Sequence, residues 1–313
     1  MAVYVVTGGA GFIGSHLVDA LLARGDSVRV LDDLSTGRVC HLDPRATFTE
    51  ADVTDPAAVA AVMQGAAGCF HLAAIASVAR CTADWREAHR TNLGGTVTVL
   101  EAAREAGRMP VVYASSAAVY GDVGGARARE DIPPHPLSAY GADKLGAELH
   151  GRVAFSVHAT PTLGLRFFNV YGPRQDPSSP YSGVISIFSR LVQQRKSLTI
   201  DGDGLQTRDF ICVDDVVAHL LAGMDRLQRH PSAEVLNVCT GIGTTVRELA
   251  DILGDLVGWR PEIGFLPARV GDIRASVGDP ARARAALAMP PAVKLRAGLE
   301  KLLSAQPLLR IAG

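Results

Sequence analysis

Apolar and polar positions follow one another along this chain in a pattern that predicts strands and helices in turn. Short apolar runs typical of buried strands recur in the first 170 residues, at 3–7, 27–31, 46–49, 69–72, 110–114 and 163–168. Helical periodicity, with apolar residues three or four positions apart, covers 16–22, 84–106 and 138–154. Because strands that alternate with helices favour a parallel sheet with right-handed crossovers, we expect an α/β protein with a doubly wound parallel sheet.

A glycine-rich turn joins the first predicted strand to the first predicted helix. Gly8, Gly11 and Gly14 follow residues 3–7 and open the helical pattern, which is the context of a dinucleotide-binding fingerprint. Gly8 permits the tight turn, Gly11 lets backbone N–H groups approach a pyrophosphate, and Gly14 lets helix and strand pack closely. The positive end of the helix dipole then faces the phosphates. The fingerprint predicts a Rossmann-type sheet.

The second predicted strand ends in Asp32 and Asp33. Asp32 lies 24 residues after Gly8, close to the offset of about 20 at which a carboxylate binds the cofactor ribose. A carboxylate at this position accepts hydrogen bonds from the ribose hydroxyls and repels a 2′-phosphate. We therefore expect NAD rather than NADP.

Composition excludes several classes of function. The chain has 313 residues, of which 48% are hydrophobic and 20% charged, with a formal net charge of −1, so nucleic acid is not expected as a partner. No apolar run approaches a membrane span, and the chain starts directly with a strand, so we expect a cytoplasmic protein without a signal peptide. The five cysteines are scattered without metal-ligand spacing, so no metal site is predicted.

The pattern changes after residue 170. A Pro- and Ser-rich stretch at 172–180 predicts a loop. Beyond it we expect helices near 183–194, 214–226 and 245–257 and strands near 198–200, 209–211 and 235–238. We therefore predict an NAD-binding Rossmann domain over 1–170. The remainder, 171–313, is expected to be a smaller α/β substrate-binding region with some segments returning to the first sheet.

Tyr140 and Lys144 lie four positions apart in the predicted helix 138–154, and so on one face of it. A tyrosine with a pKa near 10 is a poor base at neutral pH, and lowering that pKa by about 3 units takes roughly 4 kcal/mol of preferential stabilisation of the phenolate. A neighbouring ammonium and a positively charged nicotinamide ring together supply it. With Ser116 on the same substrate hydroxyl, these residues predict deprotonation of a sugar hydroxyl while hydride leaves for NAD.

These residues belong to a longer set of motifs that extends over nearly the whole chain. The set comprises the segments 7–14, 31–33, 52–53, 71–74, 115–121, 140–144, 166–174, 206–210 and 269–272, together with Asn92. It resembles the extended short-chain dehydrogenase/reductase superfamily, and within it the nucleotide-sugar 4-epimerases that act on UDP-galactose or UDP-N-acetylglucosamine. The resemblance implies an isomerase that inverts C4 of a UDP-hexose or UDP-N-acetylhexosamine through a transient 4-keto intermediate.

The resemblance also implies site residues. The catalytic residues would be Ser116, Tyr140 and Lys144. The NAD-binding residues would be Gly8, Gly11, Phe12, Ile13, Asp32, Asp33, Asp52, Val53, Leu72, Ala73, Ala74, Asn92, Ser115, Tyr140 and Lys144. The substrate-binding residues would be Ser116, Asn169, Arg174, Arg208, Arg269, Asp272 and Ser276. NAD would stay tightly bound and be recycled within each catalytic cycle, because epimerisation involves no net redox change.

Two of these residues bear on the choice of sugar. Ser276 is small at a position that walls the sugar pocket in the resembled family, which implies room for an N-acetyl group. Arg174 would make either a contact within its loop or to the diphosphate, which is the favoured interpretation, or, in a UDP-glucuronate 4-epimerase, a contact to a C6 carboxylate. A dehydrogenase or reductase of the same fold and a non-catalytic NAD-binding regulator are further alternatives. A dehydratase is disfavoured, because Ala117 follows Ser116 where sugar 4,6-dehydratases carry an Asp-Glu pair.

The resemblance implies a homodimer as well. Extended members of the superfamily commonly dimerise through two long helices of each subunit. The stretches 84–106 and 138–154 are the candidates here.

Overall fold

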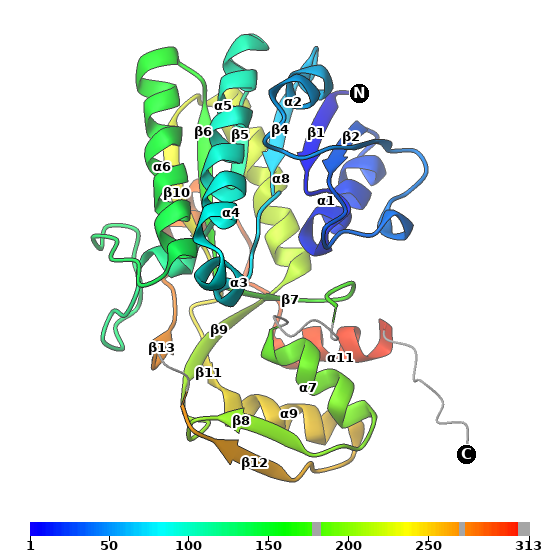
Figure 1. Cartoon of the computed structure of the whole chain (residues 1–313). Coiled ribbons are helices and arrows are strands. Elements are labelled where there is room, and N and C mark those ends of the chain that lie inside the picture. Colours follow the sequence, from blue (N-terminus) through cyan, green and yellow to red (C-terminus); the bar gives the residue numbers. More distant parts are fainter. Residues whose placement is uncertain (177–182, 269–272, 306–313) are drawn as a thin grey trace.

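A seven-stranded parallel sheet forms the centre of the molecule (Figure 1). The structure, a computed structural model, describes residues 1–176, 183–268 and 273–305. The strands lie in the order β10-β6-β5-β4-β1-β2-β3. Their bounds are Val3–Thr7 (β1), Ser27–Asp32 (β2), Thr47–Glu50 (β3), Gly68–His71 (β4), Val111–Ser116 (β5), Thr162–Phe167 (β6) and Ala233–Val238 (β10). The predicted Rossmann-type sheet is confirmed.

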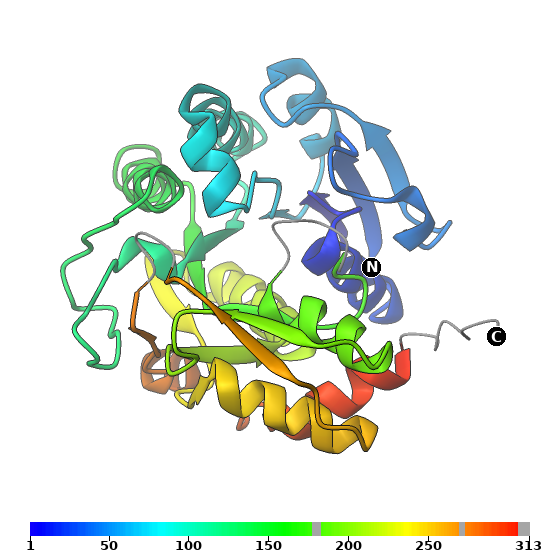
Figure 2. The ribbon, with the colours of Figure 1, turned by 60° about the horizontal axis from the view of Figure 1, so that its bottom comes forward.

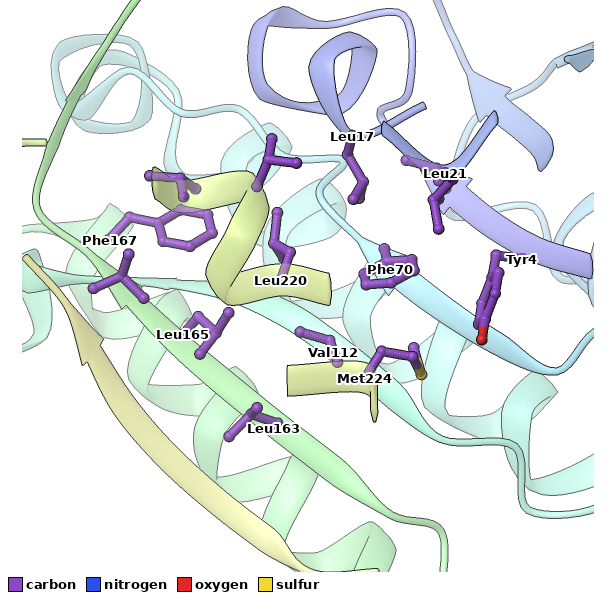
Figure 3. Packing of buried hydrophobic residues seen from close by; sticks show 14 of the residues in the cluster. Tyr4, Leu17, Leu21, Phe70, Val112, Leu163, Leu165, Phe167, Leu220 and Met224 are labelled. Atoms are coloured by element: carbon purple, nitrogen blue, oxygen red, sulfur yellow. The ribbon is translucent and has the colours of Figure 1, made fainter. Parts of the chain in front are cut away.

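Helices cover both faces of this sheet. One face carries α1 (Phe12–Ala23), α8 (Val213–Arg229) and α10 (Ala281–Leu287). The other carries α2 (Pro56–Met63), α5 (Gly95–Glu105) and α6 (Ala139–His158). Figure 3 shows the first interface, where Leu220 and Met224 of α8 lie over Phe70 and Val112 of the sheet. Strands buried on both faces explain the continuous apolar runs of the sequence.

The predicted long helix 84–106 is continuous in the chain but is not α-helical throughout. A π turn, η2 (Arg90–Gly94), lies between α4 (Trp85–His89) and α5. Asn92 lies in the π turn, accepts a hydrogen bond from the Ile75 amide (2.8 Å) and donates one to the Ile75 carbonyl (3.2 Å). Such turns are frequent at functional sites. This one places a polar side chain at the segment that follows β4.

A smaller α/β region lies across the end of the sheet at which the parallel strands terminate (Figures 1 and 2). Its strands are β7 (Asn169–Tyr171), β8 (Leu198–Asp201), β9 (Thr207–Cys212), β11 (Gly243–Thr245), β12 (Ile263–Leu266) and β13 (Ala275–Ser276). Its helices are α7 (Val184–Gln193), α9 (Val246–Val257) and α11 (Leu295–Ala305), which enclose a separate apolar core. The short elements η1 (Val39–His41), α3 (Val78–Ala83) and η3 (Ala117–Val119) lie in connections between sheet strands and helices.

The chain crosses between the two regions more than once. Only Phe168 separates the end of β6 from the start of β7, which leads from the sheet into the smaller region. Later, α8 and β10 return, so that the edge strand of the seven-stranded sheet comes from beyond residue 170. Because β1 and β4 are neighbours at the point where the strand order reverses, their carboxyl ends mark the expected binding crevice.

Candidate active site

The glycine turn after β1 is packed so closely that side chains do not fit. Gly8 has φ +70°, and a Cβ there would lie 2.6 Å from the Ala73 amide nitrogen. A Cβ on Gly14 would lie 2.1 Å from the Gly8 carbonyl oxygen. Among the described residues, no side chain caps the start of α1, and its first turn holds no acidic residue. The first N–H groups of the helix therefore point toward a place suited to an anion.

Asp32, at the end of β2, is held by the glycine turn. Its carboxylate accepts hydrogen bonds from the amides of Ala10 (2.9 Å) and Leu34 (2.9 Å). Burial raises the pKa of Asp32, and these two backbone hydrogen bonds oppose the shift. Each carboxylate oxygen keeps a further lone pair for a ribose hydroxyl. Asp33 is exposed and accepts hydrogen bonds from the amide and hydroxyl of Ser35.

The other expected cofactor residues lie around the same crevice. Phe12 and Ile13 form the first turn of α1, and Leu72, Ala73 and Ala74 follow β4. Val53 is buried against Gly95. Asp52 accepts hydrogen bonds from Thr54 and Arg90, and these outweigh the effect of partial burial and lower its pKa.

A buried histidine that was not among the sequence-predicted site residues connects three elements of the crevice. The His71 Nδ1 lies 2.8 Å from the Thr7 hydroxyl, and its Nε2 lies 3.1 Å from the Thr96 hydroxyl. The Thr96 hydroxyl donates to the Asn92 carbonyl, so it accepts from Nε2–H, and Nδ1 accepts from Thr7. Burial lowers the pKa of His71 to about 3. The neutral imidazole therefore joins β1, β4 and the helix that contains the π turn.

The structure brings Ser116, Tyr140 and Lys144 together. The Lys144 Nζ lies 5.8 Å from the centre of the Tyr140 ring and donates a hydrogen bond to the Ala114 carbonyl (2.9 Å). Ser116, at the end of β5, accepts a hydrogen bond from the Ala118 amide (3.1 Å) and lies near enough to Tyr140 to affect the pKa of the phenol. Ser138 caps α6 by accepting a hydrogen bond from the Gly141 amide (3.1 Å), which fixes where the helix begins. Close packing of this first turn against η3 leaves no room for a Cβ at Gly141, which would lie 2.6 Å from the Ala118 carbonyl oxygen.

The pKa values of Tyr140 and Lys144 differ from those expected for a tyrosine that a neighbouring ammonium makes acidic. Burial raises the pKa of Tyr140 to about 12, and the nearby Ser116 hydroxyl only partly opposes the shift. Burial also lowers the pKa of Lys144 to about 8. The surrounding side chains therefore do not by themselves make the phenol acidic. A positive charge beside the phenolic oxygen is what would lower its pKa.

A buried ion pair lies next to the expected catalytic residues. Glu148 is four positions after Lys144 on α6 and accepts hydrogen bonds from the Arg166 Nε (2.8 Å) and NH2 (2.7 Å). The Ser115 hydroxyl also donates to Glu148, so the Ser115 side chain is hydrogen-bonded to α6. The guanidinium carbon of Arg166 lies 4.6 Å from the centre of the Tyr120 ring. The network holds β5, β6 and α6 together next to Ser116.

Three of the expected substrate residues lie on adjoining strands of the smaller region. Asn169 begins β7 and pairs with Phe210 of β9, while Arg208 of β9 pairs with Ser276 of β13. Neighbouring Asp209 is buried and accepts hydrogen bonds from Thr240 and Gly241, which anchors β9. The expected residues Arg269 and Asp272 lie outside the described residues.

Arg174 lies apart from those three residues. Its NH2 is 2.7 Å from the Asp19 carboxylate of α1, and its NH1 lies 3.5 Å from the His41 carbonyl oxygen. The side chain is therefore directed to α1 and to the loop between β2 and β3. This placement agrees with the favoured interpretation of Arg174 as a loop contact and gives no support to a contact with a C6 carboxylate.

Neither a metal site nor a membrane span emerges from the parts of the chain that the structure describes. Within those residues, no group of three or more His, Cys, Asp or Glu side chains is arranged to hold a metal ion. The same residues include no helix with the length and apolar character needed to cross a bilayer.

Comparison with known proteins gives concordant matches over most of the chain. The family model described as the NAD dependent epimerase/dehydratase family matches residues 4–239. The UDP-glucose 4-epimerase of Mycolicibacterium smegmatis is 40% identical over 305 residues, which cover 95% of this chain and 96% of that relative.

Solved structures are also similar to this chain over nearly its whole length. A UDP-glucose 4-epimerase from Thermotoga maritima with UDP-glucose has a TM-score of 0.92 and 36% identity, covering 97% of this chain and 98% of that one. A UDP-N-acetylglucosamine 4-epimerase from Methanobrevibacter ruminantium, in complex with UDP-N-acetylmuramic acid, has a TM-score of 0.92 and 31% identity, covering 97% of each chain.

Proposed function

The chain belongs to the NAD dependent epimerase/dehydratase family, and on that premise we propose that it is a nucleotide-sugar 4-epimerase. It inverts C4 of a UDP-hexose or a UDP-N-acetylhexosamine through a 4-keto intermediate. The observation that carries the proposal is the grouping of Ser116, Tyr140 and Lys144 at the carboxyl end of β5. The glycine turn after β1 and Asp32 of β2, which fit a dinucleotide, lie at the same edge of the sheet as this group.

The residues around the crevice fit NAD in three respects. The glycine turn leaves the start of α1 open to a pyrophosphate, Asp32 offers oxygens to a ribose, and its negative charge disfavours a 2′-phosphate. When bound, NAD supplies the acceptor and later the donor of the C4 hydride, and its nicotinamide supplies positive charge beside the phenol. We propose the NAD-binding residues that the family resemblance implies, with Ser115 contributing through Glu148 rather than by direct contact.

The catalytic side chains then have separate tasks. Tyr140 removes the proton from the sugar O4 and returns it after inversion. Ser116 lies beside Tyr140 and would align the same hydroxyl by hydrogen-bonding to it. Lys144 is held by the Ala114 carbonyl at a fixed distance from the ring, so its charge stabilises the phenolate when it forms.

The nucleotide and sugar would bind to the smaller region. We propose Asn169, Arg208, Arg269 and Asp272 as contacts to the UDP-sugar, and Ser276 as the small residue that admits an N-acetyl group. The pairing of Arg208 with Ser276 supports their acting at one site. A UDP-glucuronate 4-epimerase is not favoured, since Arg174, the cation that would meet a C6 carboxylate, pairs with Asp19 instead.

An assay of the purified protein without added NAD tests the function. UDP-glucose, UDP-galactose and their two N-acetylated counterparts are incubated separately, and the C4 epimers are resolved by chromatography. We expect interconversion with no net change in NADH absorbance. Stoichiometric NADH would indicate a dehydrogenase, and bound NAD without turnover of any UDP-sugar would indicate a regulator. Either result would overturn the proposal.

We also propose a homodimer that works in the cytoplasm. On α6, Leu149, Val153 and Val157 are 49%, 52% and 67% exposed and lie four positions apart, which makes one apolar stripe. Val97 of neighbouring α5 is exposed as well. The stripe supports the helix-to-helix dimer that the family resemblance implies.

The described cysteines are all free thiols, which suits a reducing compartment such as the cytoplasm.

A further inference from the structure

The segment that leaves β7 runs along one face of α1. Its residues Pro173 and Arg174 contact His16 and Asp19, which lie three positions apart on the helix. Gly172 precedes them and is packed against α8, since a Cβ there would lie 2.5 Å from the Val213 side chain. The His16 Nε2 donates to the Pro173 carbonyl (3.0 Å), and the Arg174 NH2 lies 2.7 Å from the Asp19 carboxylate.

The same segment also reaches the loop between β2 and β3. The Arg174 NH1 lies 3.5 Å from the His41 carbonyl oxygen, and Asp176 lies 3.4 Å from the Arg38 guanidinium. The Arg38 amide in turn donates to the Ala10 carbonyl in the glycine turn (3.0 Å). The segment therefore connects the helix expected at the pyrophosphate with the loop that follows the expected ribose carboxylate.

The backbone at Arg174 is unusual. Its φ is +67°, in the left-handed region that residues with a Cβ rarely adopt. A residue persists in such a conformation when surrounding contacts hold it there. In this segment the contacts are those to Asp19 and to the β2–β3 loop.

We propose that Arg174 is a positioning residue that fastens the β7 segment to α1 and to the β2–β3 loop, and thereby slows the dissociation of NAD. The inference rests on the proposed function only in taking NAD as the cofactor. Dissociation requires α1 and this loop to separate around the pyrophosphate and the adenosine ribose. The contacts of Arg174 oppose that separation. An epimerase benefits from them because it returns its hydride and needs no cofactor exchange.

The test measures how fast NAD leaves the intact protein. Wild type and Arg174→Met are diluted into NAD-free buffer that contains an NAD-consuming enzyme, and the NAD still bound is measured over time. Because the Arg174 and Asp19 side chains are 29% and 40% exposed, we expect release to be about two- to fivefold faster, the range of a partly exposed ion pair. High salt should accelerate release from wild type more than from the variant.

Two further variants make the outcome specific. Asp19→Asn should accelerate release as much as Arg174→Met, and the double variant should release NAD no faster than either single variant. Arg129→Met is the control, because it removes the same charge from an exposed ion pair, Arg129 with Asp131, that belongs neither to α1 nor to the β2–β3 loop. Its release rate should equal that of wild type.

Unchanged release from both Arg174→Met and Asp19→Asn overturns the proposal. A higher KM for a UDP-sugar with unchanged release would instead assign Arg174 to the substrate. Because NAD release is measured without turnover, the result holds whether or not the protein proves to be an epimerase.

Discussion

At the scale of single residues, Tyr140 and Lys144 lie together, but their pKa values do not favour loss of the phenolic proton. Burial raises the pKa of Tyr140 to about 12 and lowers that of Lys144 to about 8. The two shifts have the same cause, since removal from water disfavours whichever form carries the charge. One additional positive charge beside the phenol would therefore lower its pKa. Deprotonation should depend on the oxidised cofactor being in place.

Replacing Tyr140 tests this assignment directly. Tyr140→Phe removes the proton-accepting oxygen and keeps the ring, so we expect turnover to fall by at least about a hundredfold, as for loss of a general base. NAD content should stay at the wild-type level, since the glycine turn and Asp32 are untouched. Turnover measured by epimer chromatography and NAD released on denaturation are the two readouts. Turnover close to wild type would remove Tyr140 from the mechanism.

At the scale of elements, local signals predicted the strands of the seven-stranded sheet, the glycine turn and the Tyr140–Lys144 face of α6, but not β11, β12 and β13 of the smaller region. Each predicted feature depends on neighbours in sequence, such as the Ser138 cap that starts α6. Contacts between distant residues were not predictable. The partner of Arg174 is 155 positions away, and the Asn92 side chain in the π turn hydrogen-bonds to the backbone of Ile75, 17 positions away. Neither contact leaves a pattern in the sequence.

The buried pair of Glu148 and Arg166 gives a prediction at this scale. Arg166→Met leaves Glu148 buried without its partner, so we expect a loss of about 3–5 kcal/mol in the free energy of unfolding. The double variant Glu148→Leu/Arg166→Met removes both charges and should recover part of this loss. Urea denaturation followed by circular dichroism measures both.

A matched control tests whether the loss of stability comes from burial of the ion pair or only from removal of a charge. Arg129 also pairs with an acid, Asp131, but both side chains are more than half exposed. Arg129→Met should therefore leave the urea midpoint nearly unchanged. If Arg129→Met and Arg166→Met destabilised the protein equally, burial would not be what makes the inner pair important.

At the scale of the whole molecule, the exposed apolar stripe of α6 predicts association. Leu149→Asp together with Val153→Asp places two charges on the stripe and should convert the dimer to a monomer at micromolar concentration. Light scattering after size-exclusion chromatography gives the mass. The control Val78→Asp changes an exposed valine of α3 outside the stripe and should remain dimeric. A monomeric wild type would contradict the prediction.

The return of β10 and α8 to the first sheet limits how this protein can be recombined. A chimaera joined at residue 170 would take its substrate half from another enzyme, and with it the edge strand beside β6 and the helix that covers Phe70 and Val112. The inherited apolar surface would then face a foreign neighbour. Engineering a new sugar preference should therefore exchange the loops around β9 and β13, and leave the scaffold of the first sheet intact.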